Sequence, residues 1–405
     1  MIEWSEEQVM VRDAIRAFID KEIKPNLEEL EHGDTPPYEV LRKLYRTFGM
    51  DAMARDRFEK SVAAGGDGDG SEGKERTEGA RDPNTVAFTL IPIIELCRYC
   101  PGMVTAMGVS VGLTAAAIMS RGTEAQKRRW ALDLLTLDKI GAWAITEPNS
   151  GSDAFGAMKS TARRDGDEYV LNGSKTFITN GPYADTIVFI CKLDEGNDPR
   201  ERKVLSFVLD AGMPGLEQSK PLRKMGLHSS PTGELFLSDV RVGKDRLIGE
   251  TEEGPARSAA KDTFSMERTG VAAMALGIVS QCLELSVQYA KDRVQFGKPI
   301  GEFQLIQLKL AKMEVVRLNI QNLVFRQVEM QAAGRPTSLA EASAMKLYSA
   351  QAAMEVALEA VQLFGGNGYM AEFQVEQLAR DAKVLQIYAG TDEIQVSQIA
   401  RSLLA

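Results

Sequence analysis

The chain is poor in the residues that bind metals or form disulfides. Its 405 residues include four cysteines and two histidines, His32 and His228, which lie far apart in the sequence. Cys97 and Cys100 are spaced as C-x-x-C, but no second pair follows, and a structural zinc site needs four ligands. We therefore expect no metal site and interpret the cysteines as buried or half-buried thiols. The shortage of histidine also disfavours a His-based catalytic triad, so carboxylates become the candidate bases.

The sequence also lacks an excess of basic residues and a long apolar run. Its 48 Lys and Arg against 57 Asp and Glu give a formal net charge of −9 at pH 7. Nucleic acid is therefore not expected as the main partner, although a local basic patch could bind an anionic nucleotide. No uninterrupted apolar stretch approaches the ~20 residues that cross a bilayer. The N-terminus, MIEWSEEQVMVRDAI, has no apolar signal segment. We expect a cytoplasmic protein without an integral membrane segment.

The spacing of hydrophobic residues divides the chain into three zones. Residues 1–135 predict helices, the first of them starting at a Ser5 cap. Residues 136–245 contain β-rich runs such as DTIVFICKL and KVLSFVLD with no helices between them, which favours a compact antiparallel sheet. Residues 246–405 predict long helices joined by short turns, as in a bundle. The predicted fold class is α+β and mostly α: an N-terminal helical domain, a central antiparallel β-domain and a C-terminal helical bundle.

Two local predictions follow from turn and loop residues. Asn172-Gly173 lies between the runs EYVL and SKTFIT and predicts a β-hairpin. The stretch 63–84, AAGGDGDGSEGKERTEGARDPN, is rich in glycine and charge and has almost no apolar residue. Such a composition cannot bury enough apolar surface to become ordered, so we expect a mobile surface loop, with a lid as the functional alternative.

The stretch Ala144-Ile-Thr-Glu-Pro-Asn-Ser-Gly-Ser-Asp153 leaves a predicted strand and enters a turn dense in small hydroxyl residues. Exposed backbone N–H groups and hydroxyls in such a turn suit an anionic or heteroaromatic ligand. Taken alone, the stretch is better explained as an ordinary polar turn.

Four motifs together resemble the acyl-CoA dehydrogenase family over nearly the whole chain. They are the stretch 144–153; KTFITNG from Lys175; RVQFGKPIG from Arg293, followed by Phe303-Gln304; and QLFGGNGY from Gln362, followed by RDA from Arg380 and IYAGT from Ile387. The resemblance implies a helical domain, a β-domain and a four-helix bundle, usually assembled as a homotetramer. It also implies FAD as cofactor, an acyl-CoA substrate and an electron-transferring flavoprotein as electron acceptor.

The resemblance further implies which residues bind the flavin. Around the ring they are Trp143, Ala144, Ile145, Thr146, Ser152, Phe177, Ile178 and Thr179, with Thr146 at the pyrimidine end and Thr179 near N5. Pyrophosphate and adenosine of a neighbouring subunit's FAD would meet Arg293, Gln295, Phe296, Phe303, Gln304, Gln362, Leu363, Phe364, Gly365 and Gly366, whereas Thr391 and Glu393 would close around the nucleotide. Phe296 and Phe303 are equally well explained as bundle core.

The reaction needs a base for the Cα proton of the thioester. Many relatives carry a glutamate where this chain has Ala389, which cannot accept a proton. The isovaleryl-CoA and long-chain branches instead place the glutamate in an E-R pair, which matches Glu267-Arg268 here. Glu267 is thus the candidate base, with Arg268 and Ser152 as substrate contacts. The N–H of Ala389, before Gly390, would bind the thioester carbonyl and stabilise the developing enolate.

Three alternatives stay open at this point. An oxygen-reactive oxidase on the same fold would perform the same desaturation, although the extra C-terminal domain of typical acyl-CoA oxidases is missing from the sequence. A flavin-binding but non-catalytic subunit of a mixed tetramer is the second alternative. The acyl group is not identified, and an acyl-carrier-protein thioester is the third.

Overall fold

The computed structural model describes residues 3–65, 83–253, 256–335 and 337–405. Most of the stretch 63–84, predicted as a mobile loop, lies outside these residues. Helices take up its two ends, because α4 (Met50–Gly65) and α5 (Pro83–Leu96) reach into the stretch from either side.

The first zone is helical, as predicted. Its helix α1 (Glu6–Phe18) begins at Ser5, whose hydroxyl accepts from the Gln8 N–H while the Gln8 side chain accepts from the Ser5 N–H, so the predicted cap is confirmed. The remaining helices of the zone are α2 (Leu27–His32), α3 (Tyr38–Thr47), α6 (Pro101–Met107), α7 (Ala116–Arg121), α8 (Glu124–Gln126) and α9 (Leu132–Leu135). A wider π-helical segment, Gly108–Ala115, joins α6 to α7 into one rod.

The second zone is a curled sheet, in which β4 (Thr186–Leu193) has three partners. Along one edge it pairs first with β1 (Gly141–Ala144) and then with β2 (Thr161–Asp165), so β1 and β2 lie end to end. Its other edge pairs with β5 (Val204–Asp210). Beyond β2 follow β3 (Glu168–Thr179), β7 (Thr232–Gly243) and β6 (Leu216–Gln218). Residues 145–160, between β1 and β2, therefore leave the sheet and return to the same edge.

Two details of the predicted β-domain need correction. The pairs β1–β4 and β2–β4 are parallel, because long connections carry the chain back to the same end of β4. Asn172-Gly173 does not form a hairpin: β3 runs straight through it, with a register irregularity between Leu171 and Gly173. The turn lies before β3, where Gly166 adopts a φ of +64°. A glycine is needed at position 173 because Ser160 packs closely against the backbone there: a Cβ would lie 2.2 Å from the Ser160 Oγ.

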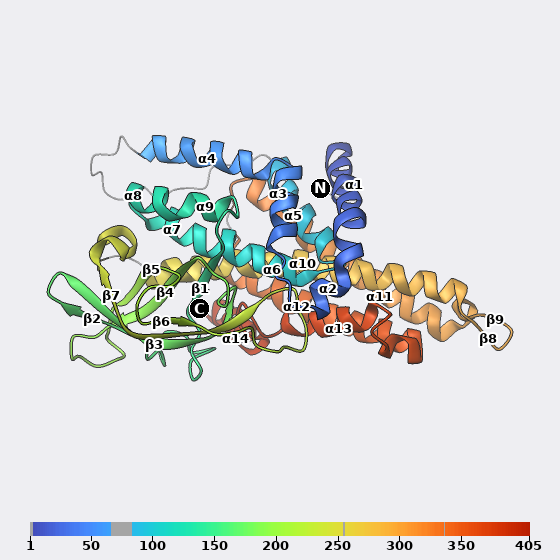
Figure 1. Cartoon of the computed structure of the whole chain (residues 1–405). Helices are drawn as coiled ribbons and strands as arrows, with labels where there is room; N and C mark the ends of the chain where they lie inside the picture. The colour runs from blue at the N-terminus through green and yellow to red at the C-terminus, as the bar shows by residue number, and fades with distance from the viewer. Residues whose placement is uncertain (1–2, 66–82, 254–255, 336) are drawn as a thin grey trace.

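The third zone is a bundle of long helices. The helices α10 (Ala256–Asp292), α11 (Gln304–Ala332) and α12 (Leu339–Phe364) are followed by the shorter α13 (Val375–Val384) and α14 (Asp392–Leu404). A small hairpin, β8 (Val294–Gln295) and β9 (Lys298–Pro299), joins α10 to α11 and projects beyond the far end of the bundle, whereas β1 and the sheet lie at the opposite end (Figure 1).

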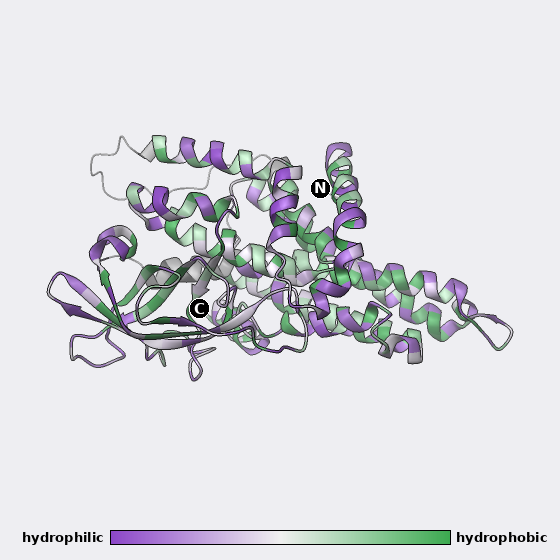
Figure 2. Ribbon diagram, in the orientation of Figure 1, coloured by the Kyte–Doolittle hydropathy of each residue, from purple (hydrophilic) through white to green (hydrophobic). Residues whose placement is uncertain are grey.

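One hydrophobic core is shared by the first and third zones. It joins α1, α5 and α6 to α10, α12 and α13, and Ala389 lies in it. A second core fills the sheet, and a third lies between the sheet and α7 to α9. Figure 2 shows the apolar residues gathered where the helices cross, with polar residues on the outer faces and on the loops of the sheet.

Two helical segments, Pro101–Arg121 and Glu267–Asp292, meet the length and composition of a membrane span. The sequence predicted no apolar run near the ~20 residues of a membrane span, whereas Pro101–Arg121 is an apolar helical segment of 21 residues. In each, 67% of the apolar window is buried within the fold. Both therefore behave as core helices, which need the same apolar composition as a span.

Candidate functional site

The residues predicted around the flavin ring meet where β1 ends. Trp143 and Ala144 belong to β1, and Ile145 and Thr146 begin the loop that follows. The end of β3 runs beside this loop, since the Thr176 N–H donates to the Thr146 carbonyl at 3.0 Å. Phe177, next along β3, is 69% exposed and has a φ of +56°. Ile178 is buried, Thr179 is half-buried, and Ser152 is exposed on the loop.

Asn180, the next residue of the same motif, ties this strand to the first zone. Its side-chain amide donates to the carbonyls of Ala106 and Gly141, both at 2.9 Å. Its oxygen accepts from the Tyr38 hydroxyl at 3.1 Å. The Gly141 N–H in turn donates to Ser110. The rod formed by α6 and α7 is thereby fixed against β1, and Asn180 is a structural member of the motif.

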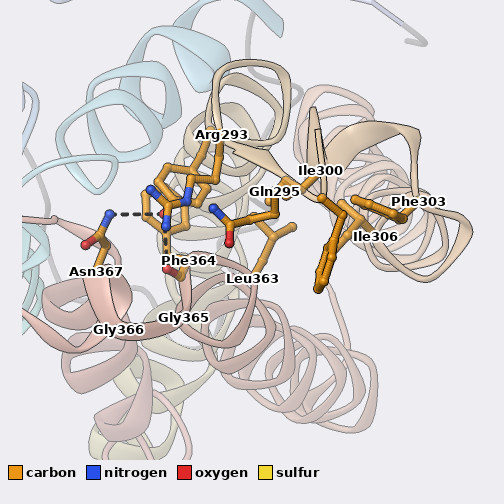
Figure 3. A pocket seen from close by; sticks show the side chains of 12 residues that line it. Arg293, Gln295, Ile300, Phe303, Ile306, Leu363, Phe364, Gly365, Gly366 and Asn367 are labelled. Atoms are coloured by element: carbon orange, nitrogen blue, oxygen red, sulfur yellow. Dashed lines mark hydrogen bonds between the residues drawn. The ribbon is translucent and has the colours of Figure 1, made fainter. Parts of the chain in front are cut away.

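A second predicted group lines a cavity at the hairpin end of the bundle (Figure 3). The cavity has a volume of about 510 Å³. The predicted residues on its wall are Arg293, Gln295, Phe296, Phe303, Leu363, Phe364, Gly365 and Gly366. Gln304 and Gln362, also predicted, are exposed nearby but are not on the wall. Phe296 is not bundle core, because it is 94% exposed at the tip of the hairpin.

The cavity fits the nucleotide half of a dinucleotide. Arg293 supplies a cation, and a Cβ at Gly365 or Gly366 would meet no atom within 4 Å, so a ligand can approach the backbone closely there. The Gly365 N–H itself donates to the Gln362 carbonyl at the end of α12. Four wall residues were not predicted: Tyr289, Ile300, Ile306 and Asn367. Tyr289 stacks on Phe364 at 4.0 Å, accepts from Asn367 and donates to the Phe364 carbonyl. Its position one turn before Arg293 was the available sequence signal.

The two groups of flavin residues do not meet within one chain. The cavity lies at the hairpin end of the molecule, whereas β1 and β3 lie at the other (Figure 1).

Glu267 lies on α10 in a largely apolar setting. Its side chain is half-buried, and within the described residues its carboxylate has no hydrogen-bond partner. Burial raises the pKa of Glu267 to about 7, although the charges of Arg268 and Lys346 act in the opposite direction. A carboxyl group with these properties is a proton acceptor matched to neutral pH.

The turn before α14 is held by two buried side chains. Arg268 donates to the Ala389 carbonyl at 3.3 Å and to the Ser343 hydroxyl at 3.1 Å. Gln395 donates to the carbonyls of Ala389 and Gly390 at 3.0 and 2.7 Å. Ala389 adopts a φ of +54°, and no acceptor in the described part of the chain takes its N–H. Arg268 thus has protein partners, and its contact to substrate stays a prediction.

Lys346 connects this turn to Glu267. It is fully buried on α12 and contacts Asp392, the first residue of α14, at 3.2 Å. Thr391 caps the same helix through the Ile394 N–H, and Glu393 is exposed beside it. The sequence reading missed Lys346 and Gln395. A lone lysine within the alanine-rich run EASAMKLYSAQAAM was the only available signal.

Three family profiles cover nearly the whole chain. The acyl-CoA dehydrogenase N-terminal domain matches residues 5–55 and 74–138, the middle domain residues 142–240, and the C-terminal domain residues 257–404.

Individual proteins agree with the profiles. The short-chain specific acyl-CoA dehydrogenase of Megasphaera elsdenii is 36% identical, with 96% of this chain and 95% of that protein covered. The butyryl-CoA dehydrogenase structure from the same organism has a TM-score of 0.85 at 34% identity over both full chains. A chain in a structure of the electron-transferring flavoprotein of Acidaminococcus fermentans matches with a TM-score of 0.81 at 33% identity, covering 100% of this chain and 99% of that one.

A cofactor is seen in one similar structure. The glutaryl-CoA dehydrogenase of Mycobacterium smegmatis in complex with FADH2 has a TM-score of 0.81 at 26% identity, with 99% of this chain and 95% of that chain covered. The predicted fold class and cofactor are therefore confirmed, and the chain belongs to the FAD-dependent acyl-CoA dehydrogenase family of oxidoreductases.

Proposed function

We propose that the protein removes two hydrogens from Cα and Cβ of an acyl-CoA thioester, giving the trans-2-enoyl-CoA. Glu267 takes the Cα proton. The observation that carries this assignment is a half-buried carboxylate without a hydrogen-bond partner in the described residues, whose pKa burial raises to about 7. Ala389 fills the position of the alternative base, which leaves Glu267 as the carboxylate of the site.

The Ala389 N–H would polarise the thioester carbonyl. It has no acceptor among the described residues, and the bonds from Arg268 and Gln395 to the neighbouring carbonyls fix the turn that presents it. A donor held in place before the reaction stabilises the enolate without reorganisation. Arg268 is then a positioning residue of this turn.

Bound FAD supplies the acceptor for the Cβ hydride. Thr146 and Thr179 would orient the ring, and the exposed Phe177 would cover one of its faces. The nucleotide half would lie in the cavity around Arg293 and Gly365, where a cation and glycines that let a ligand approach the backbone suit a pyrophosphate.

We further propose that the protein assembles as a homotetramer in which each FAD bridges two chains. The position of the two flavin groups supports this, since they lie at opposite ends of one chain (Figure 1). Apolar residues on the outer face of α11 support it as well, namely Leu305, Leu308, Val315 and Leu318, each more than 40% exposed.

An electron-transferring flavoprotein is the proposed electron acceptor. The match to a chain in the structure of the electron-transferring flavoprotein of Acidaminococcus fermentans supports this proposal. Direct reaction with oxygen is the competing proposal, and peroxide yield under air separates the two. The third proposal is a non-catalytic flavin-binding subunit. In that case no thioester would bleach the flavin. The short-chain and butyryl-CoA relatives make short acyl groups the first to test.

The test is anaerobic bleaching of the purified yellow protein with butyryl-, isovaleryl- and palmitoyl-CoA and an acyl-carrier-protein thioester. We expect the flavin absorbance to fall with at least one CoA ester and to return when electron-transferring flavoprotein is added. A protein that binds FAD but is bleached by none of these thioesters would contradict the proposal.

The base is tested with Glu267→Gln, which keeps the shape but cannot accept the proton. We expect single-turnover flavin reduction to slow by about 100-fold or more, with FAD and acyl-CoA binding nearly unchanged. Glu284→Gln is the matched control, because Glu284 lies on the same helix but is 63% exposed and pairs with Arg98. Reduction of Glu267→Gln at the wild-type rate would move the base to another carboxylate, with Glu95 as the next candidate.

A further inference from the structure

A buried ion pair lies directly behind the loop 145–160. Lys175 on β3 and Glu147 on the loop are 0% and 5% exposed, and their Nζ and Oε1 atoms are 2.9 Å apart. Removing two charges from water is costly, and replacing such a pair with apolar residues is often neutral or stabilising. Stability alone therefore does not account for this pair.

The remaining bonds of the pair go to the backbone at both ends of the loop. Lys175 Nζ donates to the Ile145 carbonyl at 3.0 Å, at the loop's first residue. The Glu147 carboxylate accepts from the N–H groups of Lys159 and Ser160, at 2.6 and 2.9 Å, where the loop rejoins β2. The pair thus joins the two ends of a 16-residue excursion to one another and to β3.

The charges of the pair are compatible with this arrangement. Burial alone would raise the pKa of Glu147, but the Lys175 ammonium and the two backbone donors outweigh it and lower the pKa. Burial also lowers the pKa of Lys175, which opposes pairing. We take the ammonium as charged, because both of its partners are oxygen acceptors and it also lies 5.2 Å above the Phe189 ring.

The clamped loop carries the residues assigned to the flavin ring. Thr146 lies between Ile145 and Glu147, and Ser152 lies further along the loop. The Thr146 carbonyl accepts from Thr176, the residue between Lys175 and Phe177. Near its other end, the Ser160 carbonyl accepts from the Lys192 N–H of β4. These backbone bonds hold the two ends of the loop to neighbouring strands, and the ion pair joins the two ends to each other.

We propose that Glu147 and Lys175 are positioning residues of the flavin site, whose ion pair holds the loop 145–152 in the shape that receives the ring end of FAD. Neither side chain reaches the flavin, since both are enclosed by protein. The inference rests on the flavin position proposed above and is independent of the acyl substrate.

The experiment removes both charges together with Glu147→Gln and Lys175→Met, so that no unpaired charge stays buried. FAD is removed, and its dissociation constant is measured by fluorescence titration alongside the melting temperature of the apoprotein. ADP competition reports on the nucleotide half separately. The matched control is Glu253→Gln with Lys203→Met, which removes an exposed pair of the same residue types.

We expect the double variant to melt as the wild-type apoprotein does, while its FAD dissociation constant rises by about tenfold or more, the loss seen when residues that orient the ligands of a bound metal are replaced. ADP affinity and the control should not change. Wild-type FAD affinity in the double variant would overturn the inference. So would a loss of folding or an equal loss of ADP affinity, since the pair would then stabilise the fold in general. A wild-type chain that binds no FAD would instead overturn the proposed function.

Discussion

At the scale of single residues, the site is defined by opposing effects on one carboxyl group. Burial raises the pKa of Glu267, and the cations Arg268 and Lys346 lower it. Arg268 is committed to the Ala389 turn, so Lys346 is the cation that can be changed with less effect on the substrate site. Lys346 is itself held by Asp392 at the start of α14. The strength of the base therefore depends on a residue that does not contact the substrate in the proposed mechanism.

The rate of flavin reduction should rise with pH through about 7, because only ionised Glu267 accepts a proton. Lys346→Met removes a charge that lowers the pKa of Glu267, so the midpoint should move to higher pH. Lys346→Arg keeps the charge and serves as the control. Single-turnover rates across neutral pH measure the midpoint, and a melting curve checks that each variant is folded. An unmoved midpoint in Lys346→Met would show that Lys346 does not act on the base.

At the scale of elements, the sequence predicted most helices and strands and mispredicted their connections. Long runs with apolar residues at three- and four-residue spacing identify α10 to α12, because that spacing is repeated over many turns. Asn172-Gly173 was misread because a glycine in a turn and a glycine under a crossing chain look the same in one sequence. Glu267 could be found through its E-R pair. Lys346, Gln395 and Tyr289 could not, because their roles depend on contacts between distant helices.

Gly173 gives a direct test of the corrected strand. In Gly173→Ala the new Cβ would lie 2.2 Å from Ser160 Oγ and 2.9 Å from Ser160 Cα, where the loop 145–160 rejoins β2. Overpacking of this kind costs about 1–3 kcal/mol, and the φ of +151° at Gly173 strains any side chain as well, so the melting temperature should fall. Gly112→Ala is the control, since a Cβ there meets nothing within 4 Å and the residue is helical. Equal melting temperatures for the two variants would contradict the close approach.

At the scale of the whole molecule, the three zones meet at a buried pair of carboxyl groups. Glu31 comes from α2, and Asp381 comes from α13 and accepts from the Leu227 N–H of the β-domain at 2.5 Å. Cys100, before α6, donates its thiol to Glu31. Burial, with the charge of Asp381, raises the pKa of Glu31 to about 8. The junction is therefore built around a carboxyl group that prefers to be protonated.

Unfolding free energy should consequently fall as pH rises. Between the unfolded value of about 4.5 and the folded value of about 8, the folded state holds one proton more on Glu31. Glu31 then contributes a loss of about 1.4 kcal/mol for each pH unit in that window. Glu267 adds a further loss up to about pH 7, because burial raises its pKa as well. Glu31→Gln should flatten this slope, whereas Glu28→Gln, an exposed change on the same helix, should not. Denaturant unfolding of the apoprotein at several pH values measures how the unfolding free energy depends on pH. An unchanged slope in Glu31→Gln would show that the extra proton of the folded state is not on Glu31.

Arg293→Ala tests the assembly. Because Arg293 lines the cavity at the hairpin end, far from β1, its loss should weaken FAD retention and association together (Figures 1 and 3). Light scattering and the flavin-to-protein absorbance ratio are the measurements. Arg241→Ala on β7 is the control, because Arg241 is 57% exposed and pairs with Asp165, away from both the cavity and α11. A monomer that retains FAD as tightly as the wild type would disprove a cofactor shared between chains.

The distance between the cavity and β1 also implies that the FAD content of each chain depends on its association with other chains. If every FAD needs two chains, dilution below the dissociation constant of the assembly releases flavin and partner in the same step, and added FAD drives the chains back together by mass action. Occupancy would then follow a steep function of chain concentration instead of a simple binding curve. In a cell that makes little of this protein, the fraction of chains that carry FAD would therefore be smaller than in a cell that makes much of it.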